Sequence, residues 1–287
     1  MAVPCPPVAQ EAIVEVIGCV VSDIGRESSD KIPRELRGLR KRSRNTELVA
    51  REETAYVDLI GRRERPPEEI QALAESGLIV RCVSLGRGLP PGQALDAPDI
   101  HVRRRVLEEL KGQIADAARL GATHGYLVPG PTPDGLPFFR EACELLADYA
   151  AGRMVRLCVE PFPGRALSTC VATLEWLEQL GHPNVSLLLD VGHCLISEED
   201  PTQMIVRAGD RLGYVHLDDN DSVGDFHWPL LTGRLTEEML AAILTVLEPD
   251  EFTGGIALEL NPANPDPLWA LGKSKAIVER IVGSQAR

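Results

Sequence analysis

Four residues that could bind a metal ion together each end a short apolar segment of the chain. They are Glu160, Asp190, His216 and Glu259, which end the segments 154–160, 185–190, 212–216 and 255–259. Three carboxylates and one imidazole form a hard, mostly oxygen donor set, which suits Mn²⁺, Mg²⁺ or Co²⁺, with Zn²⁺ as a further candidate. We therefore expect one divalent metal ion per chain.

The spacing of these residues predicts the fold that would bring them together. They lie 30, 26 and 43 residues apart, and each interval accommodates one helix and one strand. In a (β/α)8 TIM barrel the carboxyl ends of the parallel strands converge on one mouth, where active sites lie. We predict an α/β fold of this type, with the four side chains at its mouth.

Strand-like and helix-like segments alternate along the rest of the chain, as in a parallel α/β domain. We predict strands at 12–21, 54–60, 78–85, 123–128, 154–160, 185–190, 212–216 and 255–259. We predict helices at 66–76, 100–120, 136–151, 168–180, 201–208, 236–247 and 268–282. A single domain over residues 1–287 is expected, in which residues 1–50 form an atypical, basic first βα unit.

The composition is that of a globular protein, with 44% hydrophobic and 25% charged residues in a chain of 287. No apolar run reaches the roughly 18 residues needed to span a bilayer, so we expect no membrane insertion. The seven cysteines are scattered and include no CxxC pair. Because the first residues also lack the features of a signal peptide, we expect a cytoplasmic protein.

The net charge of −13 disfavours a nucleic-acid partner, because phosphate contacts require a basic face. Residues 26–44 are the exception, with eight Lys or Arg against three acidic residues. This segment is either a solvated surface or a contact for an anionic substrate or another subunit. The sequence leaves these interpretations open.

The two glutamates could also transfer protons. A metal ion that polarises a carbonyl oxygen makes the adjacent C–H more acidic, and a nearby carboxylate can remove that proton. Glu160 and Glu259 end the fifth and eighth predicted strands, so they would face each other across the mouth with a small polyol between them. One could act as base and the other as acid, whereas Asp190 and His216 would be ligands only.

Two loops near these strand ends carry further candidates. His193 follows Asp190 closely, and Gly192 would let the chain turn off the strand so that His193 could bind a substrate hydroxyl or carbonyl oxygen. Arg87 lies between Gly86 and Gly88 after the third predicted strand. It is either a solvated loop charge or a contact for a phosphate or carboxylate.

The loop after the seventh predicted strand is rich in polar and aromatic residues. Asp225 and His227 form a D-x-H pair that could bind a second metal ion or the substrate. Asp218 comes two residues after His216 and would point the same way. Trp228 could form an apolar wall against a sugar-like ring. We treat Asp218, His227 and Trp228 as candidate substrate-binding residues.

The motifs CVEP at 158–161, LDVGH at 189–193, VHLDDN at 215–220 and ALE at 257–259 resemble, in this order, those of the xylose-isomerase-like TIM barrels. This superfamily of sugar phosphate isomerases and epimerases also includes endonuclease IV. The resemblance implies a divalent metal ion held by Glu160, Asp190, His216 and Glu259, and a substrate-binding histidine at His193. It also implies isomerisation, epimerisation or dehydration of a small polyol or keto sugar, and a homodimer or homotetramer.

Some positions depart from particular branches of this superfamily. Ketohexose 3-epimerases have an Arg where this chain has Ser222, and a second Glu where it has Ala166, which disfavours an ordinary ketohexose epimerase. Inosose dehydratases have a Lys at the position of Asp218. Endonuclease IV is similar to this chain at six positions, which are Asp190, His193, His216, Asp225, His227 and Glu259. However, it needs two more zinc-binding histidines on the loops after strands two to four. The segments 57–65, 83–91 and 128–134 contain none, so DNA repair is disfavoured.

The first functional hypothesis is a metal-dependent sugar or sugar-phosphate isomerase or epimerase that abstracts a proton α to a carbonyl and forms an enediolate. A metal-dependent lyase or dehydratase acting on a keto sugar or cyclic polyol is the alternative, since it begins with the same step. A hypothesis of another class is a non-catalytic polyol-binding or accessory subunit. Solvent deuterium uptake without loss of water would favour the first.

Overall fold

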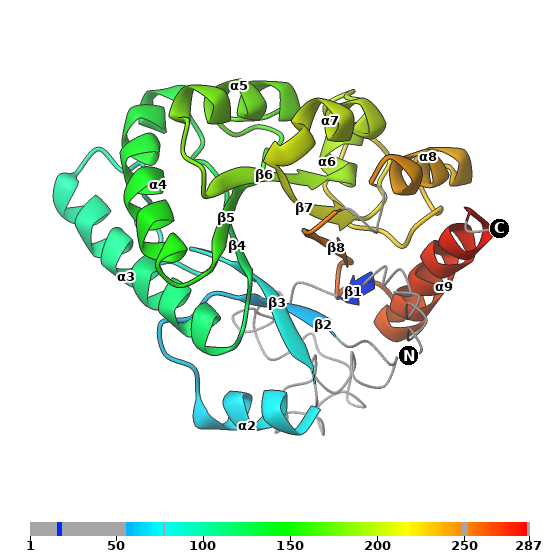
Figure 1. The fold of residues 1–287 in the computed structure, drawn as a ribbon, viewed down its shortest axis with the longest axis horizontal. Helices are drawn as coiled ribbons and strands as arrows, with labels where there is room; N and C mark the ends of the chain where they lie inside the picture. The colour runs from blue at the N-terminus through cyan, green and yellow to red at the C-terminus, as the bar shows by residue number, and fades with distance from the viewer. Residues whose placement is uncertain (1–15, 19–55, 77, 248–251, 286–287) are drawn as a thin grey trace, which may run out of the picture.

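Eight parallel strands form a closed barrel in chain order, with helices around its outside (Figure 1). The computed structural model describes residues 16–18, 56–76, 78–247 and 252–285. The strands are β1 (Val16–Gly18), β2 (Tyr56–Ile60), β3 (Ile79–Ser84), β4 (His124–Leu127), β5 (Arg156–Val159), β6 (Val185–Asp190), β7 (Leu212–Leu217) and β8 (Gly255–Leu258). The predicted (β/α)8 barrel is confirmed.

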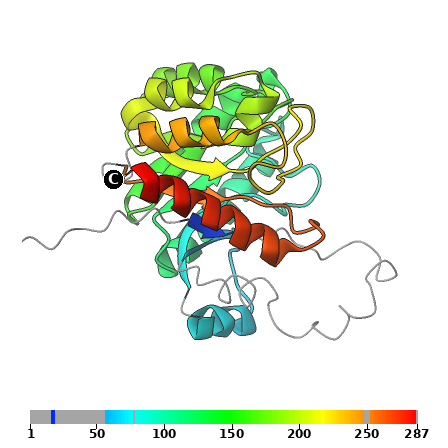
Figure 2. The ribbon, with the colours of Figure 1, turned by 90° about the vertical axis from the view of Figure 1, so that its right-hand side faces the viewer.

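The described helices cover the outside of the barrel, and from β2 onward each strand is followed by at least one of them. They are α2 (Pro67–Ser76), α3 (Ile100–Arg119), α4 (Leu136–Ala151), α5 (Cys170–Leu180), α6 (Val191–Ile196), α7 (Pro201–Ala208), α8 (Glu237–Leu247) and α9 (Pro267–Gln285). Figure 2 shows α9 lying across β1, and it also contacts β8. None of the described helices is long and apolar enough to cross a bilayer.

Seven of the predicted strands lie where the sequence placed them. The prediction for residues 12–21 can be compared only at 16–18, which form β1, and its other residues lie outside the described part of the chain. The basic segment 26–44 also lies outside it. One short helix, α6, was not predicted, because six residues are too few to show helical periodicity.

Alternation along the strands places the polar residues at the mouth. Side chains two residues apart on a strand face the same side, so every second residue points into the barrel. The interior cluster contains Cys82, Tyr126, Cys158, Leu188, Tyr214 and Ala257. The last four of these residues come two positions before Glu160, Asp190, His216 and Glu259, respectively. The four polar side chains therefore lie one layer above the apolar interior.

Candidate metal centre and substrate cavity

The structure brings together four potential ligands from the ends of β5, β6, β7 and β8. One atom from each of Glu160, Asp190, His216 and Glu259 lies within 4.8 Å of the others. All four residues are buried. The barrel ladder continues through the two glutamates, since the Glu160 and Glu259 backbone N–H groups donate to Leu127 and Leu217 at 3.0 and 3.1 Å. These backbone hydrogen bonds therefore fix the positions from which the two glutamate side chains extend.

The arrangement of donor atoms fits a divalent cation. His216 Nδ1 lies 2.7 Å from Glu259 Oε2, 3.8 Å from Glu160 Oε1 and 3.9 Å from Asp190 Oδ2. Asp190 Oδ2 is buried and has no hydrogen-bond partner among the described residues. Buried polar atoms without partners are costly. A cation held between the four side chains would satisfy this oxygen, so the residues present fit such an ion.

Burial and negative charge shift the pKa values at this centre. Burial raises the pKa of Glu160, and burial together with Asp218 raises the pKa of Asp190 to about 7. Burial alone would lower the pKa of His216, but the carboxylate of Glu259 outweighs it and raises that pKa well above its usual value. Conversely, His216 keeps the pKa of Glu259 below its usual range despite burial. These pKa shifts indicate an excess of negative charge at the centre, which a bound cation would balance.

Asp190 both ends β6 and caps α6. Its Oδ1 accepts a hydrogen bond from His193 N at 2.7 Å, which leaves Oδ2 facing the centre. Gly192 lies inside α6, where its N–H donates to Asp218 Oδ1 at 2.7 Å. A Cβ at Gly192 would come within 2.4 Å of the Asp218 carboxylate. The glycine therefore allows Asp218 to approach α6, which turns the chain away from β6 directly after Asp190.

A second group of ligating side chains adjoins the first. Asp225 Oδ1 lies 3.3 Å from His193 Nε2 and 3.0 Å from His227 Nε2, while His227 Nδ1 lies 3.0 Å from Asp218 Oδ2. His227 has a φ of 48°, a left-handed conformation that is uncommon outside glycine and frequent at functional sites. Asp225 and His227 therefore lie together, as a second metal position would require, and that role stays a prediction.

The same contacts shift the pKa values of this second group. Burial would lower the pKa of His193, but Asp190 and Asp225 raise it to about 10. Against a similar burial effect, the carboxylates of Asp218 and Asp225 raise the pKa of His227. Burial would raise the pKa of Asp225, yet His193 and His227 hold it well below its ordinary value. The histidines and carboxylates of this group therefore stabilise each other's charged forms.

A contact with the backbone of Pro161 orients the imidazole ring of His193. Its Nδ1 lies 3.0 Å from the Pro161 carbonyl oxygen, to which an Nδ1–H can donate. The edge of the ring packs against Phe162 at a centroid distance of 4.6 Å. Because these contacts hold one side of the imidazole, Nε2 faces Asp225 and the cavity. The predicted role of this nitrogen in binding a substrate oxygen stays a prediction.

A cavity of about 400 Å³ opens onto both groups, and we call this candidate binding site the substrate cavity. Its walls include Glu160, His193, Asp225, His227 and Glu259, together with Arg87, Tyr126, Phe162 and Arg165. Two predicted substrate-binding residues do not line this cavity: Asp218 is fully buried and pairs with His227, and Trp228 stacks on Phe226 at 5.0 Å. Trp228 also pairs through its backbone with Asp219, which fixes it in the loop after β7.

Asp58 is a buried site residue that the sequence analysis missed. Its Oδ1 accepts hydrogen bonds from Tyr214 Oη at 2.9 Å and Cys82 N at 3.1 Å, and its Oδ2 lies 3.6 Å from His216 Nε2. It lies within β2 and pairs with Cys82, below the ends of the strands. A carboxylate inside an otherwise apolar strand was the available signal, since such a group needs partners when buried.

The chain belongs to the xylose isomerase-like TIM barrel family, whose sequence profile matches residues 52–276. Among curated proteins, it is 31% identical to an L-ribulose 3-epimerase of Methylomonas sp. over 122 residues, 41% of this chain and 40% of that protein. It is 30% identical to a ketose 3-epimerase of Arthrobacter globiformis over 159 residues, 51% of this chain and 54% of that protein. The matched segments thus span about half of these relatives or less.

Solved structures show the same fold. The crystal structure of a D-tagatose 3-epimerase-like protein superposes with a TM-score of 0.70 over 84% of this chain and 92% of that one. The sequence identity in this comparison is 18%, so the likeness concerns the fold.

Proposed function

We propose that this protein is a divalent-metal-dependent epimerase or isomerase that removes the proton α to the carbonyl of a small keto sugar. The observation that carries the proposal is the convergence of Glu160 and Glu259 on one buried centre with Asp190 and His216. The similarity to ketose 3-epimerases supports the reaction class. The size of the substrate cavity is also suitable for a small polyol.

Glu160, Asp190, His216 and Glu259 would hold the ion. When bound there, a divalent cation polarises the substrate carbonyl and makes the neighbouring C–H more acidic. Glu160 and Glu259 approach the cavity from β5 and β8, so one carboxylate can take the proton and the other can return one to the resulting enediolate. His193 Nε2 would bind a substrate oxygen and hold the sugar between them.

Solvent deuterium uptake tests this reaction. With Mn²⁺, Mg²⁺ or Co²⁺ present, the wild-type protein should incorporate deuterium at the carbon next to the carbonyl of a ketose, as followed by NMR. Glu160→Gln and Glu259→Gln should each reduce the rate by at least about 10²-fold, because a positioned proton-transfer group contributes 10²–10⁴-fold.

The other hypotheses give different results in the same assay. Loss of water from the sugar would indicate a lyase. Binding of ketoses without any exchange would indicate a polyol-binding protein and would contradict the proposed reaction.

A further inference from the structure

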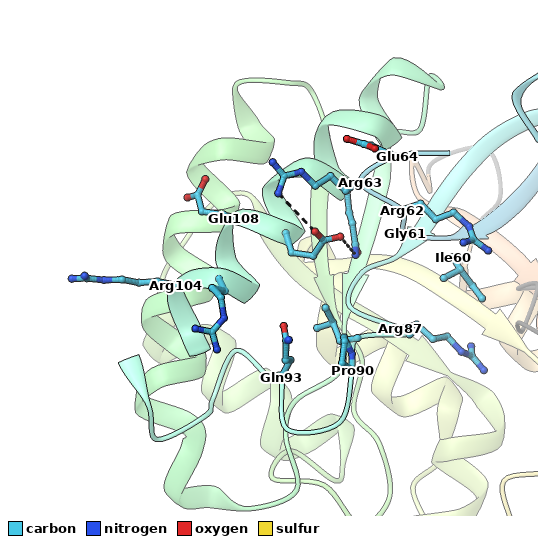
Figure 3. Close-up of a pocket in the computed structure, with 15 residues that line it drawn as sticks. Ile60, Gly61, Arg62, Arg63, Glu64, Arg87, Pro90, Gln93, Arg104 and Glu108 are labelled. Carbon is cyan, nitrogen blue, oxygen red and sulfur yellow. Dashed lines mark hydrogen bonds and ion pairs between the residues drawn. The ribbon is translucent and has the colours of Figure 1, made fainter. Parts of the chain in front are cut away.

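A second, larger cavity adjoins the substrate cavity (Figure 3). It encloses about 1030 Å³ and lies between the loops after β2 and β3 and the helix α3. Arg87, Leu89 and Gln93 line both cavities. One ligand could therefore extend from the metal centre into this second space, which we call the arginine pocket.

The arginine pocket is positively charged. Its lining includes five arginines and three glutamates: Arg62, Arg63, Arg87, Arg104 and Arg105, with Glu64, Glu108 and Glu109. Lys111 Nζ holds one of these glutamates, Glu108, at 2.8 Å. The substrate cavity is lined by four carboxylates, two arginines and two histidines, so the excess of arginine lies in the arginine pocket. A ligand with one anionic end and one uncharged end would therefore bind in a single direction, with its anionic end among the arginines.

The arginines of this pocket form only long ion pairs or none among the described residues. The nearest carboxylate oxygens lie 3.4, 3.9 and 3.6 Å from Arg62, Arg63 and Arg87, beyond the roughly 2.7–2.9 Å of strong charge-assisted bonds. Arg104 and Arg105 form no ion pair within the described part of the chain. Arg65 shows the contrast, since it is buried and contacts two carboxylates at 2.5 Å. The arginines of the pocket can therefore reorient toward a ligand without breaking a strong ion pair.

Arg87 is the arginine at the junction of the two cavities. Its Nη1 lies 3.6 Å from the candidate ligand Glu259, and its side chain is 45% exposed. Gly86 and Gly88 on either side have φ values of 80° and 90°, and a Cβ at Gly88 would meet no atom within 4 Å. Figure 3 shows Arg62 and Arg87 extending toward the same side of the pocket. The planar guanidinium fork binds phosphate and carboxylate groups through paired hydrogen bonds.

We propose that the natural substrate is an anionic keto sugar, whose phosphate or carboxylate binds in the arginine pocket with Arg87 as its innermost contact. The carbonyl end then lies at the metal centre, away from the anionic group. This inference names the substrate class of the proposed function and rests on it.

Equilibrium binding measures this preference without requiring turnover. D-fructose, D-fructose 6-phosphate and a keto sugar acid with a terminal carboxylate are titrated calorimetrically into wild type, Arg87→Gln and Arg207→Gln. Arg207 of α7 is the matched control, because its side chain is also 45% exposed and pairs with Glu175 of α5 at 3.3 Å. Arg62→Gln is a second test variant that leaves the Glu259 contact intact. Circular dichroism verifies that each variant is folded.

We expect wild type to bind at least one anionic sugar about tenfold or more tightly than fructose, as lost charged hydrogen bonds typically weaken binding to that degree. Arg87→Gln and Arg62→Gln should each lose most of this preference. Arg62→Gln should leave fructose binding within about threefold, because Arg62 lines only the arginine pocket, and Arg207→Gln should match wild type. Tighter binding of fructose 6-phosphate would identify the anionic group as a phosphate, and tighter binding of the sugar acid would identify it as a carboxylate. Added salt should weaken only the anionic ligands.

Equal affinity for neutral and anionic sugars, no binding of any of the three, or an equal loss for all sugars in Arg62→Gln would overturn the inference. Failure of the proposed function gives a separate signature. In that case the anionic sugar binds in an Arg87-dependent manner, but its α-carbon takes up no deuterium.

Discussion

Asp58 connects the barrel interior to the candidate metal centre. Tyr214 Oη and Cys82 N hold its Oδ1, while Oδ2 lies beside His216 Nε2 and has no other partner among the described residues. A histidine that ligates a metal usually donates its other ring N–H to a carboxylate, which fixes the tautomer and the ring. We expect Asp58 to perform this task, so that the lone pair of Nδ1 is directed at the ion.

Asp58→Asn tests this role with little change in shape. An amide N–H in place of Oδ2 would oppose the N–H of His216, so the affinity for Mn²⁺ should fall about 10–100-fold. Calorimetric titration of Mn²⁺ into metal-free protein measures the loss. Tyr214→Phe is the control, because it removes a single hydrogen bond to Oδ1 and keeps the carboxylate; its loss should be smaller. Wild-type affinity in Asp58→Asn would refute the role.

The sequence revealed the four candidate ligands but not this partner. Glu160, Asp190, His216 and Glu259 could be grouped because each ends an apolar strand, and strand ends meet at the mouth whatever the side-chain details. The partners of Asp58 come from β3 and β7, and Tyr214 is 156 residues away in the chain. Such a contact depends on strand register within the barrel, which spacing alone does not determine. Trp228 could not be placed from its sequence position for the same reason.

At the scale of elements, the β6–α6 junction shows how one residue serves two structures. Asp190 is the last residue of β6 and the N-cap of α6, and a helix begins directly after it. The strand was predictable from its continuous apolar run. The helix was not, since its six residues are stabilised by the cap and by Asp218 from the loop after β7.

His124, at the start of β4, should make stability depend on pH. Burial, together with Arg81 and Arg156, lowers its pKa to about 3, against about 6.5 in an unfolded chain. Between about pH 3 and pH 6.5 the unfolded state binds a proton that the folded state does not. The free energy of unfolding therefore falls as the pH drops below about 6.5. At pH 5 the loss should be about 2 kcal/mol relative to pH 7.5.

His124→Phe isolates this contribution, because it keeps a ring beside Tyr214 and removes the titrating group. Urea unfolding of both proteins at pH 5 and 7.5, in the same metal state, gives the comparison. The difference between the two pH values should be about 2 kcal/mol smaller in the variant. An unchanged difference would show that His124 does not titrate as the structure implies.

At the scale of the whole molecule, closure of the barrel brings together candidate functional side chains from distant parts of the chain. The strands bring β5 to β8 together at the metal centre, and the loops after β2 and β3 add the arginine pocket beside it. Alternation of strands and helices was enough to predict this architecture. One domain for residues 1–287, an oligomeric assembly and a cytoplasmic location stay predictions.

The central claim is that Glu160, Asp190, His216 and Glu259 bind one divalent metal ion. Elemental analysis of purified wild type, of the Glu160→Ala/His216→Ala double variant and of the exposed control Glu175→Gln tests it most directly. After incubation with Mn²⁺, Mg²⁺, Co²⁺ or Zn²⁺ and removal of excess, wild type and control should retain about one ion per chain, and the double variant almost none. A wild-type protein without metal, or a double variant that retains as much as wild type, would contradict the claim.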